Sequence, residues 1–186
     1  MHDGLLTFAA FAGSLRKGSY NGMLLRALVK LAPPGIRIDT LDLTGLPLFN
    51  MDLETDPPAV VKRMRETIRA ADGLIVVSPE HNGIVPAVTK TVIEWASRPP
   101  DDSVLEGKPA GLLGASTGGL GTVKAQLNIR QIATVESVYF LQDPEVRVAR
   151  VKAKFDDKGE LIDDDLRAEL VEFLNALVAW TRKITG

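Results

Sequence analysis

Cysteine is absent from this sequence of 186 residues, and histidine occurs only twice. Without cysteine the chain can form no disulfide bond, no thiol nucleophile and no iron–sulfur cluster. Two histidines that stand far apart in the sequence argue against a structural zinc site, and we expect no bound metal. Any redox chemistry of this protein therefore requires a bound cofactor.

An excess of charge of one sign is also absent. Lys and Arg together number 22, Asp and Glu together number 24, and the formal net charge is -2. This balance offers no broad basic surface for nucleic acid or for an anionic membrane. No apolar run reaches the length of about 20 residues that spans a bilayer, and the first residues lack the cationic segment of a signal peptide. We expect a cytoplasmic protein with neither nucleic-acid nor membrane partners.

The sequence does contain a regular alternation of strand-like and helix-like segments. Apolar residues make up 45% and charged residues 25%, as in an ordinary globular domain. Apolar runs that end in Gly, Ser, Pro or Asn predict buried strands at residues 5–12, 73–78, 110–115 and 138–141, and an alternating stretch at 36–43 predicts an edge strand. Apolar residues at three- and four-residue spacing predict helices at about 20–31, 58–68, 86–98, 122–133 and from 164 onward. A further strand is expected at 146–151.

This alternation predicts an α/β fold with a mainly parallel sheet and helices on both faces. Five main strands in this length favour the doubly wound flavodoxin-like order 2-1-3-4-5 over the six strands of a full dinucleotide-binding fold. At roughly 150 residues per domain, we expect residues 1–186 to form a single domain. In such a sheet the ligand binds where the first and third strands end, because the chain leaves these strands toward opposite faces.

The loop after the first predicted strand has the composition of an anion site. Residues 13–21 combine glycines, two hydroxyl groups at Ser14 and Ser19, and Arg16 just before a helix. The loop lacks the Lys and Ser/Thr of a nucleotide P-loop, and no G-x-G-x-x-G follows the strand. The alternative is that these residues merely turn the chain and cap the helix.

Two further loops are expected at the same edge of the sheet. Residues 79–84 can place backbone amides and the His81 ring against a flat ligand, or they form a plain turn in which Asn82 and Gly83 adopt positive φ. Residues 116–121 contain three glycines, which permit close approach of the backbone to a ligand or form a flexible connection.

The three segments together resemble the NAD(P)H-dependent FMN reductases of the flavodoxin-like superfamily, which include quinone and chromate reductases and some azoreductases. The resemblance rests on residues 13–21, on Ser78-Pro79-Glu80-His81-Asn82-Gly83 followed by Ile93-Glu94-Trp95, and on residues 116–131. Two departures stand out. The family usually has Tyr at the position of His81, and it commonly has Gly-Gly-Arg-Ala-Gln where this chain reads Gly121-Thr122-Val123-Lys124-Ala125-Gln126.

The resemblance implies a set of FMN-binding residues in the three loops. Those expected at the 5′-phosphate are in the first loop, those at one edge of the isoalloxazine in the second, and those at its other side in the third. In order they are Ser14, Arg16, Ser19, Tyr20 and Asn21, then Pro79, Glu80, His81, Asn82, Gly83 and Ile84, and finally Ser116, Thr117 and Gly118.

The activity implied by the resemblance is hydride transfer from NAD(P)H to bound FMN, followed by two-electron reduction of a quinone, chromate, an azo compound or a flavin. No side-chain acid or base is required, and backbone amides at Asn82 and Gly83 would stabilise the reduced flavin. A homodimer or homotetramer is also implied, for which the mixed face of the predicted helix 122–133 is our candidate contact surface. The alternative function is a flavodoxin-type electron carrier that does not itself oxidise NAD(P)H. A phosphoacceptor receiver domain is disfavoured, because the first and third strands lack the acidic residues it needs.

Overall fold

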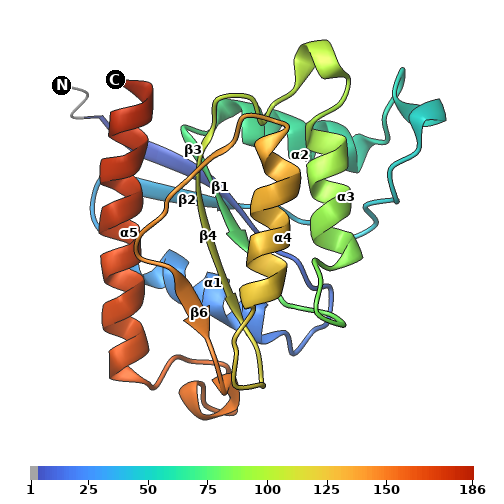
Figure 1. Ribbon diagram of the computed structural model, residues 1–186. Coiled ribbons are helices and arrows are strands. Elements are labelled where there is room, and N and C mark those ends of the chain that lie inside the picture. The colour runs from blue at the N-terminus through green and yellow to red at the C-terminus, as the bar shows by residue number, and fades with distance from the viewer. Residues whose placement is uncertain (1–3) are drawn as a thin grey trace.

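The computed structural model describes residues 4–186, so His2 lies outside the described residues. Strands and helices alternate along the chain as expected (Figure 1). The strands are β1 (Leu6–Ala12), β2 (Ile36–Thr40), β3 (Gly73–Val77), β4 (Pro109–Ala115), β5 (Tyr139–Phe140) and β6 (Val146–Val148). The α-helices are α1 (Tyr20–Leu31), α2 (Ala59–Ala70), α3 (Ala87–Ala96), α4 (Val123–Thr134) and α5 (Asp164–Thr185), and three short 3-10 helices are η1 (Met51–Leu53), η2 (Pro100–Asp102) and η3 (Val151–Lys154).

The sheet is parallel, and its strand order β2-β1-β3-β4-β5 confirms the predicted flavodoxin-like order. The strands expected at residues 138–141 and 146–151 are both present as short pieces, and together they form the outer strand of the sheet. β5 pairs with the beginning of β4 at Pro109 and Ala110, and β6 pairs with its end from Leu113 to Ala115. The strand expected at 146–151 ends at Val148, and η3 follows it.

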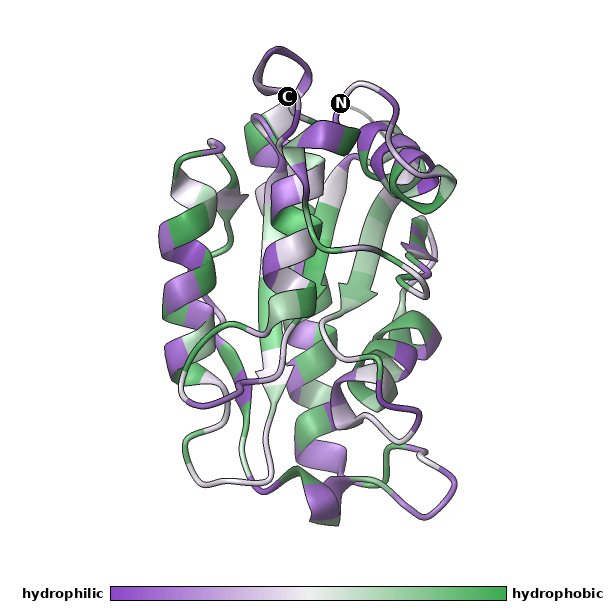
Figure 2. Cartoon of the chain, turned by 90° about the vertical axis from the view of Figure 1, so that its right-hand side faces the viewer, coloured by the Kyte–Doolittle hydropathy of each residue, from purple (hydrophilic) through white to green (hydrophobic). Residues whose placement is uncertain are grey.

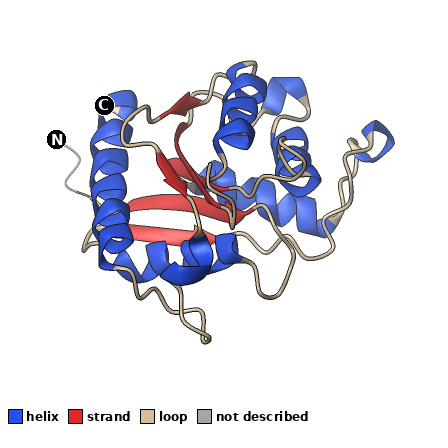
Figure 3. Ribbon diagram, turned by 60° about the horizontal axis from the view of Figure 1, so that its bottom comes forward, coloured by secondary structure: helices blue, strands red, loops and turns tan. Residues whose placement is uncertain are grey.

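Alternate residues of the strands face two separate cores. Phe8 and Ala10 of β1 belong to a core covered by α1 and α5, whereas Ala9 and Phe11 face α2, α3 and α4. The period-2 alternation of side chains in a strand explains this division. Because each fully buried Leu or Phe contributes about 1.5–3 kcal/mol, both layers stabilise the sheet. Figure 2 shows the strands as largely hydrophobic ribbons between helices of mixed polarity, and Figure 3 shows helices on both faces of the sheet.

Two of the helices, α1 and α5, begin at residues whose side chains accept hydrogen bonds from free N–H groups of the first turn. The Ser19 hydroxyl accepts a hydrogen bond from Gly22 N (3.2 Å) and caps α1, and the Asp163 carboxylate accepts one from Leu166 N (2.8 Å) and caps α5. Two further acidic residues lie in the first turn of α5 and basic residues lie in its last turn, as the helix dipole favours. The cap of α1 also fixes the end of the loop that follows β1.

The segment between β2 and α2 projects from the body of the molecule and carries η1 at its tip (Figure 3). Its base is held by Trp95, whose Nε1 donates to Pro47 O (2.9 Å) and whose ring packs edge-on against Phe49. Leu48 and Met51 are 72% and 64% exposed on this segment. Within residues 4–186, no helix combines the length and the apolar character needed to cross a bilayer.

Candidate functional site

The loops that follow β1, β3 and β4 meet at one end of the molecule, at the bottom of Figure 1. Backbone hydrogen bonds join the ends of the three strands: Gly13 N donates to Val77 O (2.9 Å), and Ser78 N donates to Leu113 O (2.9 Å). The carboxyl ends of parallel strands share one edge of the sheet, and this edge is where ligands bind in folds of this order. The three predicted loops therefore form one rim.

The rim requires glycine where neighbouring elements approach most closely. A Cβ added to Gly13 would lie 2.0 Å from Thr89 Oγ1, and one added to Gly114 would lie 2.1 Å from Ser78 O. Ser78 and Thr89 are fully buried and share a hydrogen bond between their hydroxyl oxygens (3.1 Å). Thr89 and Gly114 thus help to build the rim, although neither is among the residues predicted for it.

The first loop presents hydrogen-bond donors to solvent. The backbone N–H groups of Leu15, Lys17 and Gly18 have no acceptor within residues 4–186. The guanidinium of Arg16 lies 5.7 Å from the centre of the Tyr20 ring, and its side chain is exposed together with Lys17. The hydroxyl of Ser14 accepts from Arg16 N at 3.5 Å and remains able to donate. Such a set of donors suits a phosphate.

Asn21 has a different position from the one expected for a phosphate ligand. It is 4% exposed, its Nδ2 donates to Ala115 O (2.9 Å), and its Oδ1 accepts from Ala115 N (2.9 Å). Both ends of its side-chain amide are therefore used to fasten α1 to the end of β4. Asn21 positions the first loop against the third, whereas the neighbouring Ser19 keeps a hydroxyl hydrogen that can be donated.

The second loop forms a tight turn. His81 N donates to Ile84 O (3.1 Å), Ile84 N donates to His81 O (3.0 Å), and the two residues between them have positive φ, 53° at Asn82 and 75° at Gly83. The positive φ expected for a plain turn is thus present, and the turn also exposes the N–H groups of Asn82 and Gly83 at the rim. Pro79 is buried at its base, and Ile84 is 52% exposed.

Glu80 connects the second loop to the third. Its Oε2 accepts hydrogen bonds from Lys124 N (2.9 Å) and Ala125 N (3.1 Å) at the beginning of α4. The N-cap residue Thr122 makes no side-chain capping bond, so the Glu80 carboxylate takes over this function from another loop. The Glu80 side chain therefore points toward α4, which favours a positioning role over flavin contact.

The third loop is held by the chain that follows β6. Arg150 N donates to Gly118 O (3.0 Å), and Val151 N donates to Ser116 O (3.1 Å). The hydroxyl of Ser116 accepts from Gly118 N (3.1 Å), which closes a local turn. Thr117 and Gly118 are exposed at the rim beside the other two loops. The segment from Arg150 onward was not among the predicted site residues, because its contact with the third loop is not visible in any local pattern.

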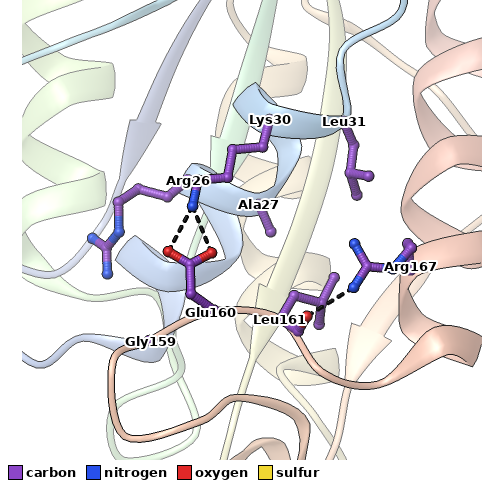
Figure 4. A pocket seen from close by; sticks show the side chains of 8 residues that line it. All are labelled: Arg26, Ala27, Lys30, Leu31, Gly159, Glu160, Leu161 and Arg167. Atoms are coloured by element: carbon purple, nitrogen blue, oxygen red, sulfur yellow. Dashed lines mark hydrogen bonds and ion pairs between the residues drawn. The ribbon is translucent and has the colours of Figure 1, made fainter.

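Two hollows lie away from the rim. One, of about 50 Å³, lies between α1 and the turn at Gly159 (Figure 4), where Lys30 forms an ion pair with Glu160 (2.5 Å) and Arg167 donates to Leu161 O (2.8 Å). The other, of about 320 Å³, opens between the ends of α3 and α4, at the opposite edge of the sheet. The first is too small for a flavin, since cofactor sites usually measure about 300–1,000 Å³. The second lies at the edge where sheets of this type do not bind ligands.

The fold and the rim together define a protein of the flavodoxin-like class. The residues fit FMN on two observations: unpaired backbone N–H groups and Arg16 lie in the first loop, and the exposed turn of the second loop lies at the same rim. Phosphates bind at glycine-rich loops that precede a helix, and a flat ring can lie against the loops beside them.

Comparisons with known proteins identify the family within this class. The profile of the NADPH-dependent FMN reductase family matches residues 6–152. An NAD(P)H-dependent FMN reductase of Pseudomonas aeruginosa is 44% identical over 177 residues, which cover 94% of this chain and 95% of that protein. A 2-hydroxy-1,4-benzoquinone reductase of a Burkholderia species is 37% identical over 177 residues, which cover 95% and 97% of the two chains.

A solved structure leads to the same family. The flavoenzyme NAD(P)H:(acceptor) oxidoreductase FerB of Paracoccus denitrificans superposes with a TM-score of 0.88 at 31% identity, over 96% of this chain and 98% of the other. The chain belongs to the NADPH-dependent FMN reductase family. It is an oxidoreductase with FMN as cofactor and NAD(P)H as co-substrate, as the sequence predicted.

Proposed function

We propose that this protein reduces a quinone by two electrons at the expense of NAD(P)H, with FMN held by the three loops of the rim. The choice of acceptor is supported by the relative that is named a 2-hydroxy-1,4-benzoquinone reductase and matches nearly the full chain. The observation that carries the placement of the site is the junction of the three loops through Gly13, Asn21 and Glu80. The entire chain acts as one FMN-binding domain.

The residues of the rim bind and orient the cofactor. Arg16, the hydroxyls of Ser14 and Ser19, and the free N–H groups of the first loop hold the 5′-phosphate. The N–H groups of Asn82 and Gly83 donate to the edge of the ring and stabilise negative charge there. When bound, FMN would supply the two-electron redox chemistry between NAD(P)H and the acceptor. The protein contributes no side-chain acid or base.

An absorbance experiment tests this function. The protein is loaded with FMN, freed of excess cofactor, and mixed with NADPH under anaerobic conditions. The flavin absorbance should bleach promptly and return when 2-hydroxy-1,4-benzoquinone is added. Failure to retain FMN would reject the site, and retention of FMN without bleaching would reject the reductase activity.

A pair of variants tests the phosphate loop. Arg16→Gln should weaken FMN binding at least about tenfold, because a charge-assisted hydrogen bond to phosphate is worth roughly 1.5–3 kcal/mol. Arg26→Gln is the matched control, since this exposed arginine lies on α1 beyond the loop. Equal FMN affinity of the two variants would remove Arg16 from the site.

The flavodoxin-type carrier is the less supported alternative. The relatives that cover nearly the full chain at 37–44% identity are named reductases. Prompt bleaching by NADPH separates the two functions, because a carrier stays oxidised without a partner enzyme. Reduction of chromate and azo compounds and a cytoplasmic location stay predictions from the sequence.

The protein functions as a homodimer or homotetramer in this proposal. Support comes from apolar side chains that are exposed beside the rim: Leu127 on α4 is 61% exposed and Leu120 before it is 71% exposed. These residues lie on or next to the helix whose mixed face the sequence indicates as the contact surface. Sedimentation should show an oligomer that Leu127→Glu dissociates, and a wild-type monomer at micromolar concentration would contradict this.

A further inference from the structure

The rim is basic although the chain as a whole is slightly acidic. Arg16, Lys17, Lys124 and Arg150 are exposed, and none of them forms an ion pair within residues 4–186. The formal net charge of the chain is -2, so the positive charge is local. Such a local field attracts an anionic substrate and raises its rate of association.

Arg150 differs from the other cations of the rim in its backbone. Its φ of 47° and ψ of 41° place it in the left-handed region, which residues other than Gly, Asn and Asp rarely adopt. Its N–H group is bonded to Gly118 O (3.0 Å), and that bond fixes it beside the third loop. Backbone conformations of this kind are concentrated at functional sites. Arg147, three residues earlier, forms an ion pair with Glu145 and is neutralised there.

The place of Arg150 separates it from the FMN phosphate. The first loop follows β1, and Arg150 follows β6, which lies three strands away in the order β1-β3-β4-β6. At about 4.8 Å per strand, the two ends lie about 14 Å apart along the rim. The FMN phosphate is already served by the first loop, and a quinone carries no phosphate. The nicotinamide dinucleotides carry phosphates of their own, and the planar guanidinium of Arg150, unpaired among the described residues, suits a phosphate at this distance from the first loop.

Resting on the proposed function, we infer that Arg150 binds the 2′-phosphate of NADPH and makes NADPH the preferred co-substrate. A phosphate monoester carries a charge of about -1.5 to -2 at neutral pH and offers three acceptor oxygens. The planar guanidinium matches two of these oxygens at once, which an ammonium cannot do. NADH lacks this phosphate and gains nothing from Arg150.

The test uses the FMN-loaded protein and Arg150→Asn, which removes the charge but tolerates the left-handed backbone. Calorimetric titration with adenosine 2′,5′-bisphosphate should show a loss of affinity of about tenfold or more, while 5′-AMP binds as before. The ratio of kcat/KM for NADPH to that for NADH should fall by the same factor. Arg147→Gln is the matched control and should change neither quantity more than about twofold.

Several outcomes would overturn the inference. An unchanged ratio in Arg150→Asn would do so, and equal losses with NADPH and NADH would assign Arg150 to the pyrophosphate instead. Arg150→Gly is the second variant, and its thermal midpoint checks that folding is intact. If the wild type binds the bisphosphate through Arg150 but oxidises neither nucleotide, the proposed reductase function fails and the phosphate site stands.

Discussion

Replacement of Glu80 by Ala tests whether one carboxylate holds two parts of the rim together. The substitution removes the acceptor of Lys124 N (2.9 Å) and Ala125 N (3.1 Å), and no other side chain among the described residues caps α4. Lys124 is exposed and water can replace its partner, but Ala125 is fully buried and its N–H group would be left unsatisfied. We expect the free energy of unfolding to fall by at least about 2 kcal/mol, the lower end of the sum of about 1–3 kcal/mol for an unsatisfied buried donor and about 1 kcal/mol for a lost cap.

This loss has two measurable consequences. For a chain of this length, about 2 kcal/mol lowers the thermal midpoint by roughly 4–8 °C. If FMN must restore the order of the second loop on binding, its binding free energy becomes less favourable by the same amount. FMN should then bind about 30-fold more weakly. Glu80→Gln keeps an oxygen acceptor without the charge and should lose about half as much.

Glu66→Ala provides the matched control, because Glu66 is exposed on α2 and forms no ion pair within the described part of the chain. Amide hydrogen exchange gives a local readout: the Ala125 N–H should exchange faster in Glu80→Ala and unchanged in the control. The reasoning would be refuted if Glu80→Ala kept the wild-type midpoint, the wild-type exchange at Ala125 and the wild-type FMN affinity.

Three further substitutions test the packing and charge around the rim and the helices. Gly13→Ala should lower the free energy of unfolding by about 2–3 kcal/mol, because its Cβ would lie 2.0 Å from Thr89 Oγ1. In urea unfolding, the double variant with Thr89→Ala should lose over about 1 kcal/mol less than the sum of the two single losses. Arg65→Met removes a buried guanidinium that donates to four carbonyl groups and to Asp102, and we expect a loss of about 3 kcal/mol in the same assay; a loss under about 1 kcal/mol would contradict this. Hydrogen bonds from Leu166 N and Lys154 hold the pKa of Asp163 below its ordinary value of 3.8, so its stabilising effect is present above that pH and is lost as the pH falls below it. Between about pH 6 and about pH 3 the thermal midpoint should therefore fall less steeply in Asp163→Asn, which keeps the cap of α5, than in the wild type. Equal slopes in the two proteins would disprove this contribution.

Sequence patterns predict the fold of this chain well where both faces of a strand are buried. Residues 73–77 are apolar throughout and form β3, and the stripe over residues 20–31 forms α1. The outer strand was predicted less well. Its first piece is reduced to Tyr139 and Phe140, because pairing with β4 is shared with β6, and a short apolar run cannot show how many residues a neighbouring strand will bind.

The candidate site was likewise predictable from the sequence only in part. The position of its three loops follows from the strand order alone, since the carboxyl ends of parallel strands share one edge. The roles of Asn21 and Glu80 do not follow from it, because their hydrogen-bond partners are 94 and 44 residues away in the sequence. A polar residue in a binding loop looks the same in the sequence whether it contacts a ligand or another loop.

The two bridging side chains hold the loops in place and leave the backbone N–H groups free to bind ligand beside Arg16 and the serine hydroxyls. Asn21 and Glu80 use their polar atoms within the protein, whereas the N–H groups of Leu15 and Gly18 have no acceptor among residues 4–186. Backbone donors survive most side-chain substitutions, provided that the loops keep their positions. This explains how the second loop can carry His81 where the family usually has Tyr, since the turn is closed by the backbone N–H and carbonyl groups of residue 81. Variation in this site should therefore be tolerated at exposed side chains that bind no phosphate, such as His81, and costly at the bridges.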